Sequence, residues 1–580
     1  MLSNTFAPEL LALFFALTTT FGSPVHWDIA TTQPDVCLDG TANVTFRGSS
    51  KSSVESFRNI RFGQDTSDAN RFASPRPYTY PANNIYDANR PGAACPQQRV
   101  PLPGIPLFDN VTNISEDCLT LRVDRPSGTR RDAKLPVMVY IYGGGDTIGQ
   151  IYDEAYDPGA LVLASVEKHS PVIYAAMNYR VGIFGFAASS ALRAADSLNV
   201  GLLDQRLGLE WIKENIAAFG GDPDRVTIFG ESDGATGVGL QITAYGGQVE
   251  SVPFQRAILQ SGGPTADPGT ASNVSAEHTA QVVQLTNCTA ATDEADLSCL
   301  RKLPLSTLLE IAVAYETSVV QWGFDVFIPT APSSFIPDSP SRLLRSGQFA
   351  RGIDIISGWN EDDGSLFTLP TLQSDTDVAE FLLESFPGLT NASVRNAMRL
   401  YPTVEFETVQ SNEVSPQYFR ASRMYRDATF SCPSLLMVQS NRRHHQGRHE
   451  RAPSDYLYAL NQTVFAASYA AENASFYGVA HFSDIPFVFD QASTRYAAVA
   501  SPADKALASE MCGSWIAFAA TGKVERDDVT LNDWPASGTA DDVRVIGGSR
   551  PRYMSGHDYE QLASRCEFWN SPLLTEQLEV

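Results

Sequence analysis

One stretch constrains the fold of this chain more than any other. In residues 226–234 an apolar, β-branched run leads directly into Gly230-Glu231-Ser232-Asp233-Gly234, and small and aliphatic residues that can form a helix follow it. This order of strand, sharp turn and helix predicts a nucleophile elbow, which holds a serine exposed above a sheet. Glycines at both ends of the turn would leave out a Cβ where the strand and the helix crowd together. The alternative is an ordinary glycine-rich turn, so the interpretation depends on the residues around it.

Segments with strand and helix patterns alternate along the chain. Apolar runs at 137–142 and 172–177 are typical of strands that are covered on both faces. An amphipathic helix over 203–219 ends at Gly220-Gly221, just before the elbow strand. We expect further strands at 119–123, 256–260, 353–357 and 455–460, helical insertions at 266–350 and 364–450, and antiparallel strands within 36–62. This order predicts an α/β protein with a central, mostly parallel sheet flanked by helices, and with a small N-terminal antiparallel sheet.

The composition indicates an exported, acidic protein. The 580 residues include 42 Lys and Arg against 66 Asp and Glu, which gives a net charge of -24 and disfavours binding to nucleic acids and anionic membranes. Residues 1–22 resemble a secretory signal peptide, although Glu9 and the absence of Lys or Arg before the apolar run are atypical. The alternative is an N-terminal anchor or a buried helix. No later stretch is long enough to cross a bilayer, so we expect residues 23–580 to form one large domain without stable membrane insertion.

Sequons and cysteines agree with export. The eight cysteines are even in number and show no zinc-type C-x-x-C spacing, so disulfides are expected. Candidate glycosylation sites, each the start of an Asn-x-Ser/Thr sequon, are Asn43, Asn110, Asn113, Asn273, Asn287, Asn391, Asn461 and Asn473.

The order of three residue types along the chain predicts nucleophilic catalysis. A serine hydroxyl needs a neutral imidazole to take its proton, and the imidazole needs an acid to orient it. In this class of fold the chain order is serine, acid, histidine. Ser232 is the candidate nucleophile, and His481 follows the last predicted strand by a loop. The acid is one of Glu361, Asp362 and Asp363, which come just after a strand.

Backbone amides for an oxyanion hole are also predicted. Gly144 and Gly145 follow the apolar strand at 137–142, and glycine amides are not blocked by a side chain. The amide of Asp233, at the start of the elbow helix, would be the third donor.

The chain resembles the type-B carboxylesterase/lipase family, which includes cholinesterases and fungal lipases. The matching segments are Ser115-Glu116-Asp117-Cys118-Leu119, Tyr142-Gly143-Gly144-Gly145, Asn178-Tyr179-Arg180-Val181-Gly182, Asn199-Val200-Gly201-Leu202-Leu203-Asp204-Gln205, Phe219-Gly220-Gly221-Asp222-Pro223, Gly230-Glu231-Ser232, Gln260-Ser261-Gly262 and residues 515–522. The resemblance implies an α/β-hydrolase fold, a triad of Ser232, Asp363 and His481, and an oxyanion hole of Gly144, Gly145 and Asp233. It also implies disulfides Cys95–Cys118, Cys288–Cys299 and Cys432–Cys566, with Cys37 and Cys512 left as a further pair or as thiols, and a structural ion pair between Arg180 and Asp204.

Three residues depart from the pattern of that family. Asp233 stands where alanine is usual, and its carboxylate would oppose an oxyanion unless it turns away or is paired. Asp146 stands where an aromatic residue usually follows the glycines. Asp363 stands where glutamate is usual and is one methylene shorter, so we expect His481 to lie closer to it.

Other charged residues are expected to have structural roles. His444, His445 and His449 lie among arginines, which disfavours a metal ion and favours a solvated basic loop. The acidic runs 361–363 and 527–528 lack the spacing of a calcium loop. Glu231 is expected as a buried carboxyl near Ser232, with a purely structural role equally open.

These observations predict a secreted serine carboxylesterase that acts on a small ester through an acyl-enzyme and needs no cofactor or metal. One alternative is a lipase, but the segment between Cys95 and Cys118 is Pro-rich and carries sequons, which makes a poor amphipathic lid and favours soluble esters. The other alternative is a non-catalytic binding protein on the same fold.

Overall fold

The computed structural model describes residues 33–38, 43–99, 111, 113–248, 252–320, 324–407, 413–445, 454–526, 529–536, 541–548 and 553–580. Its strands are β1 (Asp35–Leu38), β2 (Val44–Arg47), β3 (Ser49–Lys51), β4 (Val54–Arg61), β5 (Ile85–Asp87), β6 (Thr120–Pro126), β7 (Leu135–Ile141), β8 (Ile173–Met177), β9 (Gly221–Glu231), β10 (Arg256–Gln260), β11 (Asp354–Asn360), β12 (Asp455–Leu460), β13 (Val543–Ile546) and β14 (Tyr553–Met554).

The α-helices of the described residues are α1 (Gly159–Glu167), α2 (Gly182–Phe186), α3 (Ser190–Ala194), α4 (Val200–Asn215), α5 (Asp233–Thr243), α6 (Val274–Leu285), α7 (Asp293–Lys302), α8 (Leu305–Val319), α9 (Pro340–Ser346), α10 (Asp375–Ser385), α11 (Asn391–Leu400), α12 (Pro416–Arg426), α13 (Cys432–His445), α14 (Ala466–Ala471), α15 (Ile485–Val488), α16 (Pro502–Thr521), α17 (Leu562–Trp569) and α18 (Pro572–Gln577).

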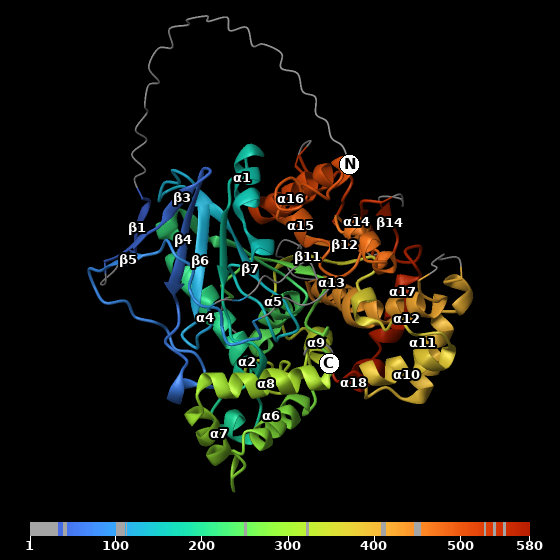
Figure 1. The fold of residues 1–580 in the computed structure, drawn as a ribbon. Coiled ribbons are helices and arrows are strands. Elements are labelled where there is room, and N and C mark those ends of the chain that lie inside the picture. Colours follow the sequence, from blue (N-terminus) through green and yellow to red (C-terminus); the bar gives the residue numbers. More distant parts are fainter. Residues whose placement is uncertain are drawn as a thin grey trace, which may run out of the picture.

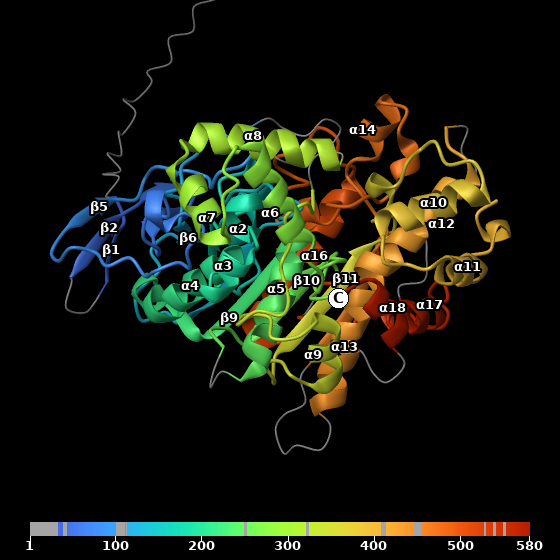
Figure 2. The same ribbon diagram turned by 90° about the horizontal axis from the view of Figure 1, so that it is seen from below.

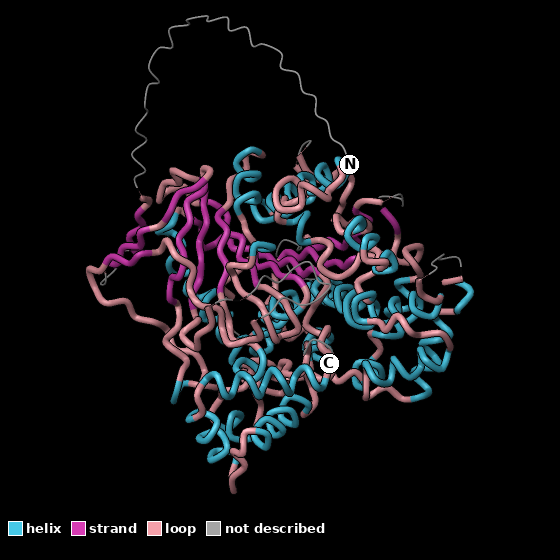
Figure 3. The backbone as a smooth tube through the Cα atoms, viewed as in Figure 1, coloured by secondary structure: helices cyan, strands magenta, loops and turns pink. Residues whose placement is uncertain are grey.

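Eleven strands form one sheet, which crosses the molecule as a band in Figures 1 and 3. The strand order is β14-β13-β12-β11-β10-β9-β7-β8-β6-β4-β3. The strands from β13 to β8 in this order are parallel to their neighbours, and antiparallel pairing is confined to the two edges. The strand that precedes Ser232, β9, is at the centre with five strands on each side. The predicted α/β class is therefore confirmed.

Helices cover both faces of this sheet, and the core lies along both faces. In Figure 1, α1, α15 and α16 lie above the sheet, whereas α4, α5 and α13 lie below it. The strands β8, β11 and β12 are buried along their whole length, and apolar residues occupy both faces of β8 and most of β12.

The two predicted insertions are helical. Figure 2 shows α6, α7 and α8 as one group and α10, α11 and α12 as another, beside the C-terminal helices α17 and α18. The first group follows β10 and the second follows β11, so each extends a connection at the carboxyl end of a parallel strand.

Two details differ from the sequence predictions. The small N-terminal sheet contains the expected antiparallel pair β1–β2, but β5 adds to β2 in parallel, so the sheet is mixed. The strand β12 is not the last of the main sheet, because β13 and β14 lie beyond it. A run of four residues such as β13 is too short to show a reliable pattern, which is why it was missed.

The structure contains the three disulfides that the resemblance implies: Cys95–Cys118, Cys288–Cys299 and Cys432–Cys566. Cys37 and Cys512 are free thiols. Within the described part of the chain, no helix combines the length and the apolar character that a membrane crossing requires.

Candidate active site

The predicted elbow is a sharp turn between β9 and α5. Ser232 connects them with φ 59° and ψ -130°, a conformation that side-chain-bearing residues rarely adopt. A Cβ on Gly230 would collide with the backbone of Gly234, and one on Gly234 would collide with the backbone of Ile141 and Tyr142. The expectation that both glycines are needed for close packing is therefore confirmed, and the turn places the Ser232 hydroxyl at the carboxyl edge of the sheet.

His481 connects the serine to an acid. Its Nε2 lies 2.8 Å from Ser232 Oγ, and its Nδ1 lies 2.8 Å from Asp363 Oδ1. The imidazole is buried, with the Phe430 ring stacked at 4.8 Å between centroids. Ser232, Asp363 and His481 thus come together from the ends of β9 and β11 and from the segment after β12.

The three candidate acids after β11 have different partners. Asp363 is fully buried and accepts the Asn360 N–H (2.7 Å) besides facing His481. Asp362 accepts the Val479 N–H (2.9 Å), which ties the acid loop to the segment that carries the histidine. Glu361 accepts the Tyr559 hydroxyl (2.9 Å), so it faces the C-terminal part of the chain. The geometry therefore singles out Asp363 among the three.

The glycine loop, residues 143–149, presents amides toward Ser232. Gly144 and Gly145 have φ values of +127° and +62°, which favour glycine. The Asp233 carboxylate does not turn away from these amides: its Oδ2 accepts the N–H of Gly145 and that of Gly144 (3.3 Å). The same oxygen also lies 3.3 Å from Ser232 Oγ. A carboxyl oxygen of the protein itself thus occupies the position that the resemblance assigns to the oxyanion.

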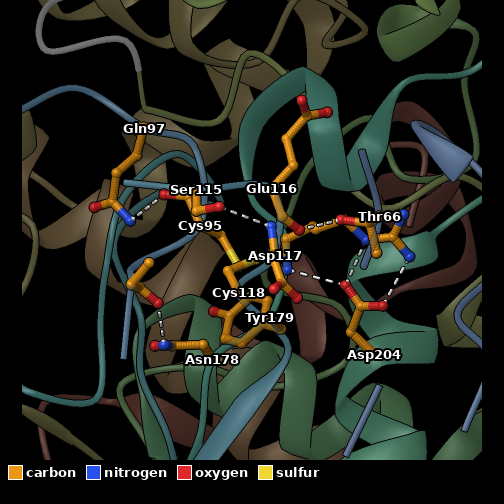
Figure 4. Close-up of a disulfide and its surroundings, with 12 residues drawn as sticks. Thr66, Cys95, Gln97, Ser115, Glu116, Asp117, Cys118, Asn178, Tyr179 and Asp204 are labelled. Carbon is orange, nitrogen blue, oxygen red and sulfur yellow. Dashed lines mark hydrogen bonds and ion pairs between the residues drawn. A yellow bond between two sulfur atoms is a disulfide. The ribbon is translucent and has the colours of Figure 1, made fainter. Parts of the chain in front are cut away.

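The segment that carries Cys95 holds the glycine loop in place. Figure 4 shows the Cys95–Cys118 disulfide with Gln97 next to it. The Gln97 side chain donates to the Gly149 carbonyl (2.7 Å) and accepts the Gly149 N–H (2.9 Å). The disulfide therefore supports the amides indirectly, through one buried glutamine.

Further carboxyls surround Asp233. One carboxylate oxygen from each of Asp146, Asp233 and Asp267 lies within 4.8 Å of the other two, and all three residues are buried. Burial, and then the charges of Asp233, Asp267 and Asp325, raise the pKa of Asp146 well above its ordinary value. The sequence drew attention to Asp233 and Asp146 only, because Asp267 follows β10 at a position outside every matching segment.

Two more acids lie on the histidine side of the site. Glu231 Oε1 is 3.4 Å from His481 Nε2, and burial is the main cause that raises the Glu231 pKa well above its ordinary value. Asp484 is also buried, its pKa is raised to about 6 mainly by burial, and it accepts the Gln260 side-chain amide (2.7 Å). The expectation of a buried Glu231 carboxyl near Ser232 is confirmed.

A small pocket with a cavity volume of about 50 Å³ adjoins Ser232. Its larger apolar and aromatic lining residues are Phe324, Ile328, Phe367, Tyr425, Phe430 and Phe482. Its polar lining includes Asp233, Asp267 and Asp325, so an apolar group and a polar or cationic group would both find partners in it.

The remaining predicted residues lie away from the pocket. Arg180 and Asp204 form a buried bidentate ion pair with both N–O distances at 2.7 Å. The predicted solvated loop is wrong for His444 and His445, which form the end of α13. His444 is half-buried and hydrogen-bonded to the Arg345 carbonyl (3.0 Å), whereas the side chain of His445 and the whole of His449 lie outside the described residues.

The glycosylation candidates and the N-terminal prediction have a separate outcome. The exposed sequon asparagines are Asn43, Asn113, Asn273, Asn287, Asn391 and Asn473, and Asn461 is half-buried. Asn110, the predicted signal peptide at residues 1–22 and the acidic run 527–528 lie outside the described residues.

Comparison with known proteins gives a consistent result. A family model described as "Carboxylesterase family" matches residues 37–569. The protein "Inactive carboxylesterase-like protein VdtD" of Byssochlamys spectabilis is 38% identical, over 97% of this chain and 98% of its own length. "Secreted lipase ARB07186/07185" of Arthroderma benhamiae is 34% identical over 95% and 97%, respectively. "Lipase 2" of Geotrichum candidum is 32% identical over 79% of this chain and 84% of its own length.

Proposed function

Because the chain belongs to the carboxylesterase family, we propose that it is a secreted serine hydrolase that cleaves carboxylic esters through an acyl-enzyme intermediate. The observation that carries this proposal is the position of His481, with one ring nitrogen 2.8 Å from Ser232 Oγ and the other 2.8 Å from Asp363 Oδ1. Secretion is supported by relatives named as secreted lipases and by the signal-peptide pattern of residues 1–22.

The geometry supports the following order of steps. His481 Nε2 takes the Ser232 proton as Oγ attacks the ester carbonyl carbon, while Asp363 holds the ring in the required tautomer. The amides of Gly144, Gly145 and Asp233 stabilise the oxyanion once the Asp233 carboxylate has left its place. His481 then protonates the departing alcohol. Water next attacks the acyl-enzyme, with His481 taking a proton from the water and returning it to Ser232 Oγ.

The substrate class follows from the pocket. Five aromatic side chains and Ile328 contribute to its lining, so we propose an ester with an apolar acyl or alcohol group. Several relatives are named lipases, and an acylglycerol ester is the alternative substrate.

A second candidate function is non-catalytic binding on the same fold. It is favoured by the Asp233 carboxylate, which accepts hydrogen bonds from the amides that an oxyanion would need. A relative that is similar over nearly the whole chain is named inactive, which agrees with this alternative.

Labelling with a fluorophosphonate probe, followed by an assay of p-nitrophenyl ester hydrolysis, decides between the two functions. We expect the probe to label the wild-type chain, and Ser232→Ala to lose both the label and at least about 10³-fold in kcat. The control is Ser564→Ala, an exposed serine away from the pocket, which should retain both. A folded wild-type chain that takes no label and hydrolyses no ester would establish the non-catalytic function instead.

A further inference from the structure

Three buried carboxyls converge beside Ser232 from three different parts of the chain. Asp146 belongs to the glycine loop, Asp233 begins α5, and Asp267 follows β10. Their closest carboxylate oxygens lie within 4.8 Å of one another. Asp325 lies near the same group and lines the same pocket.

Within the described residues, no positively charged side chain is paired with this carboxyl cluster, which consists of Asp146, Asp233 and Asp267. The charged neighbours that act on Asp146 are three other carboxyls, and the charged neighbour that acts on Asp267 is Asp233. Among the described residues, no arginine or lysine forms an ion pair with any member of the cluster. Buried charges are ordinarily paired or bound to a metal ion, because an unpaired one is costly to remove from water.

Two carboxyl oxygens of the cluster lack a hydrogen-bond partner, which indicates a ligand independently of the distances between the carboxyls. Asp146 Oδ2 and Asp267 Oδ2 are buried and have no hydrogen-bond partner within the described part of the chain. The two residues are only 4% and 7% exposed. Asp267 Oδ1, by contrast, accepts the Thr236 hydroxyl at 3.3 Å, so each residue retains at least one oxygen for a further bond.

The spacing fits a small cation with oxygen ligands. Ca²⁺ binds carboxylate oxygens at about 2.3–2.6 Å, so two ligands on opposite sides of one ion are at most about 5 Å apart. Oxygens that all lie within 4.8 Å of one another satisfy this limit. Carboxylates without nitrogen or sulfur ligands favour Ca²⁺, Mg²⁺ and Mn²⁺ over softer metals. The pocket gives the cluster a path to solvent, because it is lined by Asp233 and Asp267.

We infer that Asp146, Asp233 and Asp267 form a binding site for one divalent cation next to the nucleophile. Water would complete the coordination, and the ion would supply the positive partner that no arginine or lysine of the described residues gives these carboxyls. The ion would also attract the Asp233 carboxylate and thereby reduce its opposition to an oxyanion at Gly144 and Gly145. This consequence rests on the proposed hydrolysis, whereas binding of the ion does not depend on it.

The test is cation binding by the full chain, measured without any ester. Protein stripped with EDTA and dialysed is titrated with Ca²⁺, Mg²⁺ and Mn²⁺ by isothermal calorimetry, and its thermal unfolding is followed with and without each ion. We expect one ion per chain for at least one of the three metals, a higher unfolding temperature in its presence, and at least ten-fold weaker binding for both Asp146→Asn and Asp267→Asn.

The matched control is Asp455→Asn, at the start of β12. Asp455 is buried and also has one unpartnered carboxylate oxygen, but it lies at the opposite end of the parallel strands. This variant should bind the ion as the wild-type chain does. Absence of binding by folded wild-type protein at millimolar metal, or unchanged binding in both cluster variants, would overturn the site.

A second measurement needs no variant. Anomalous scattering from a crystal soaked in Mn²⁺ should place the ion between the three carboxyls. An ion located only elsewhere would refute the inference. Fluorophosphonate labelling of Ser232 is measured in the same EDTA-treated protein. Loss of cation binding with labelling retained would contradict the cation site alone, and loss of labelling with cation binding retained would contradict the proposed hydrolysis alone.

Discussion

Asp363 is one methylene shorter than the glutamate that is usual in the carboxylesterase family, yet its Oδ1 lies 2.8 Å from His481 Nδ1. We expect Asp363→Asn to lower kcat by about 10⁴-fold, because an amide no longer holds the imidazole in the tautomer that accepts the serine proton. The measurement is hydrolysis of a p-nitrophenyl ester by the variant and the wild type.

The control for this variant is Glu361→Gln. Burial is the main cause that raises the Glu361 pKa to about 8, so the side chain is already largely neutral near pH 7, and glutamine keeps an acceptor for Tyr559. Its kcat should remain close to wild type. If Glu361→Gln lost more activity than Asp363→Asn, the assignment of Asp363 would be wrong.

Asp233 is the residue whose carboxylate competes with the oxyanion. We expect Asp233→Ala to raise kcat/KM by about 100-fold, which corresponds to about 2.7 kcal/mol, because the substrate no longer has to displace an anion held by two N–H donors. Steady-state kinetics on a soluble ester measures the change. Asp233→Asn keeps a neutral oxygen in the same place, so its kcat/KM should lie between those of the wild type and Asp233→Ala. An alanine variant whose kcat/KM is no higher than that of the wild type would show that the carboxylate does not obstruct the reaction.

At the scale of single elements, α8 carries one buried acid, Glu316, close to the start of α2. Burial raises its pKa from 4.5 to about 8, although the Ile183 N–H acts in the opposite direction. Between pH 4.5 and about pH 8, Glu316 is ionised in the unfolded chain but still protonated in the folded chain. The free energy of unfolding therefore falls by about 1.4 kcal/mol per pH unit as pH rises over that range.

Glu316→Gln should remove this loss. We expect the stability of the variant, relative to wild type, to increase from about pH 5 to about pH 8 and to change little above that. Urea unfolding at pH 5, 6.5 and 8 measures the trend. Glu310→Gln on the exposed face of the same helix is the control and should show no such trend. A stability difference for Glu316→Gln that is independent of pH would contradict the raised pKa.

The elements themselves were largely predictable. The strands β10 and β12 have the predicted bounds of 256–260 and 455–460, because each is an apolar run of strand length between polar turns. The parallel addition of β5 and the presence of β13 and β14 were not predictable, because strands of two to four residues at or next to a sheet edge are defined by the partners that they bind.

At the scale of the whole molecule, the net charge of -24 opposes adsorption to anionic lipid surfaces. A strongly acidic protein is repelled by anionic surfaces, so we expect it to act on esters in solution. The segment 100–110, where a lid would lie, is outside the described residues.

A kinetic comparison checks this expectation. The rate on p-nitrophenyl butyrate should saturate with the dissolved ester and show no jump as the ester passes its solubility limit. A sharp rise in rate on emulsified long-chain ester would favour a lipase instead.

The sequence by itself determined the features that local rules govern: the turn at Ser232, the alternation of strands and helices, and the chain order of serine, acid and histidine. These follow from residue size, hydrophobic periodicity and glycine conformation, which act over a few neighbours. The family resemblance already implied Asp363, and in the structure this acid faces His481. Only the tertiary structure decided that the Asp233 carboxylate lies against the glycine loop. It also brought Asp267 to Asp146, because the direction of a side chain and its distant neighbours depend on how the whole chain packs.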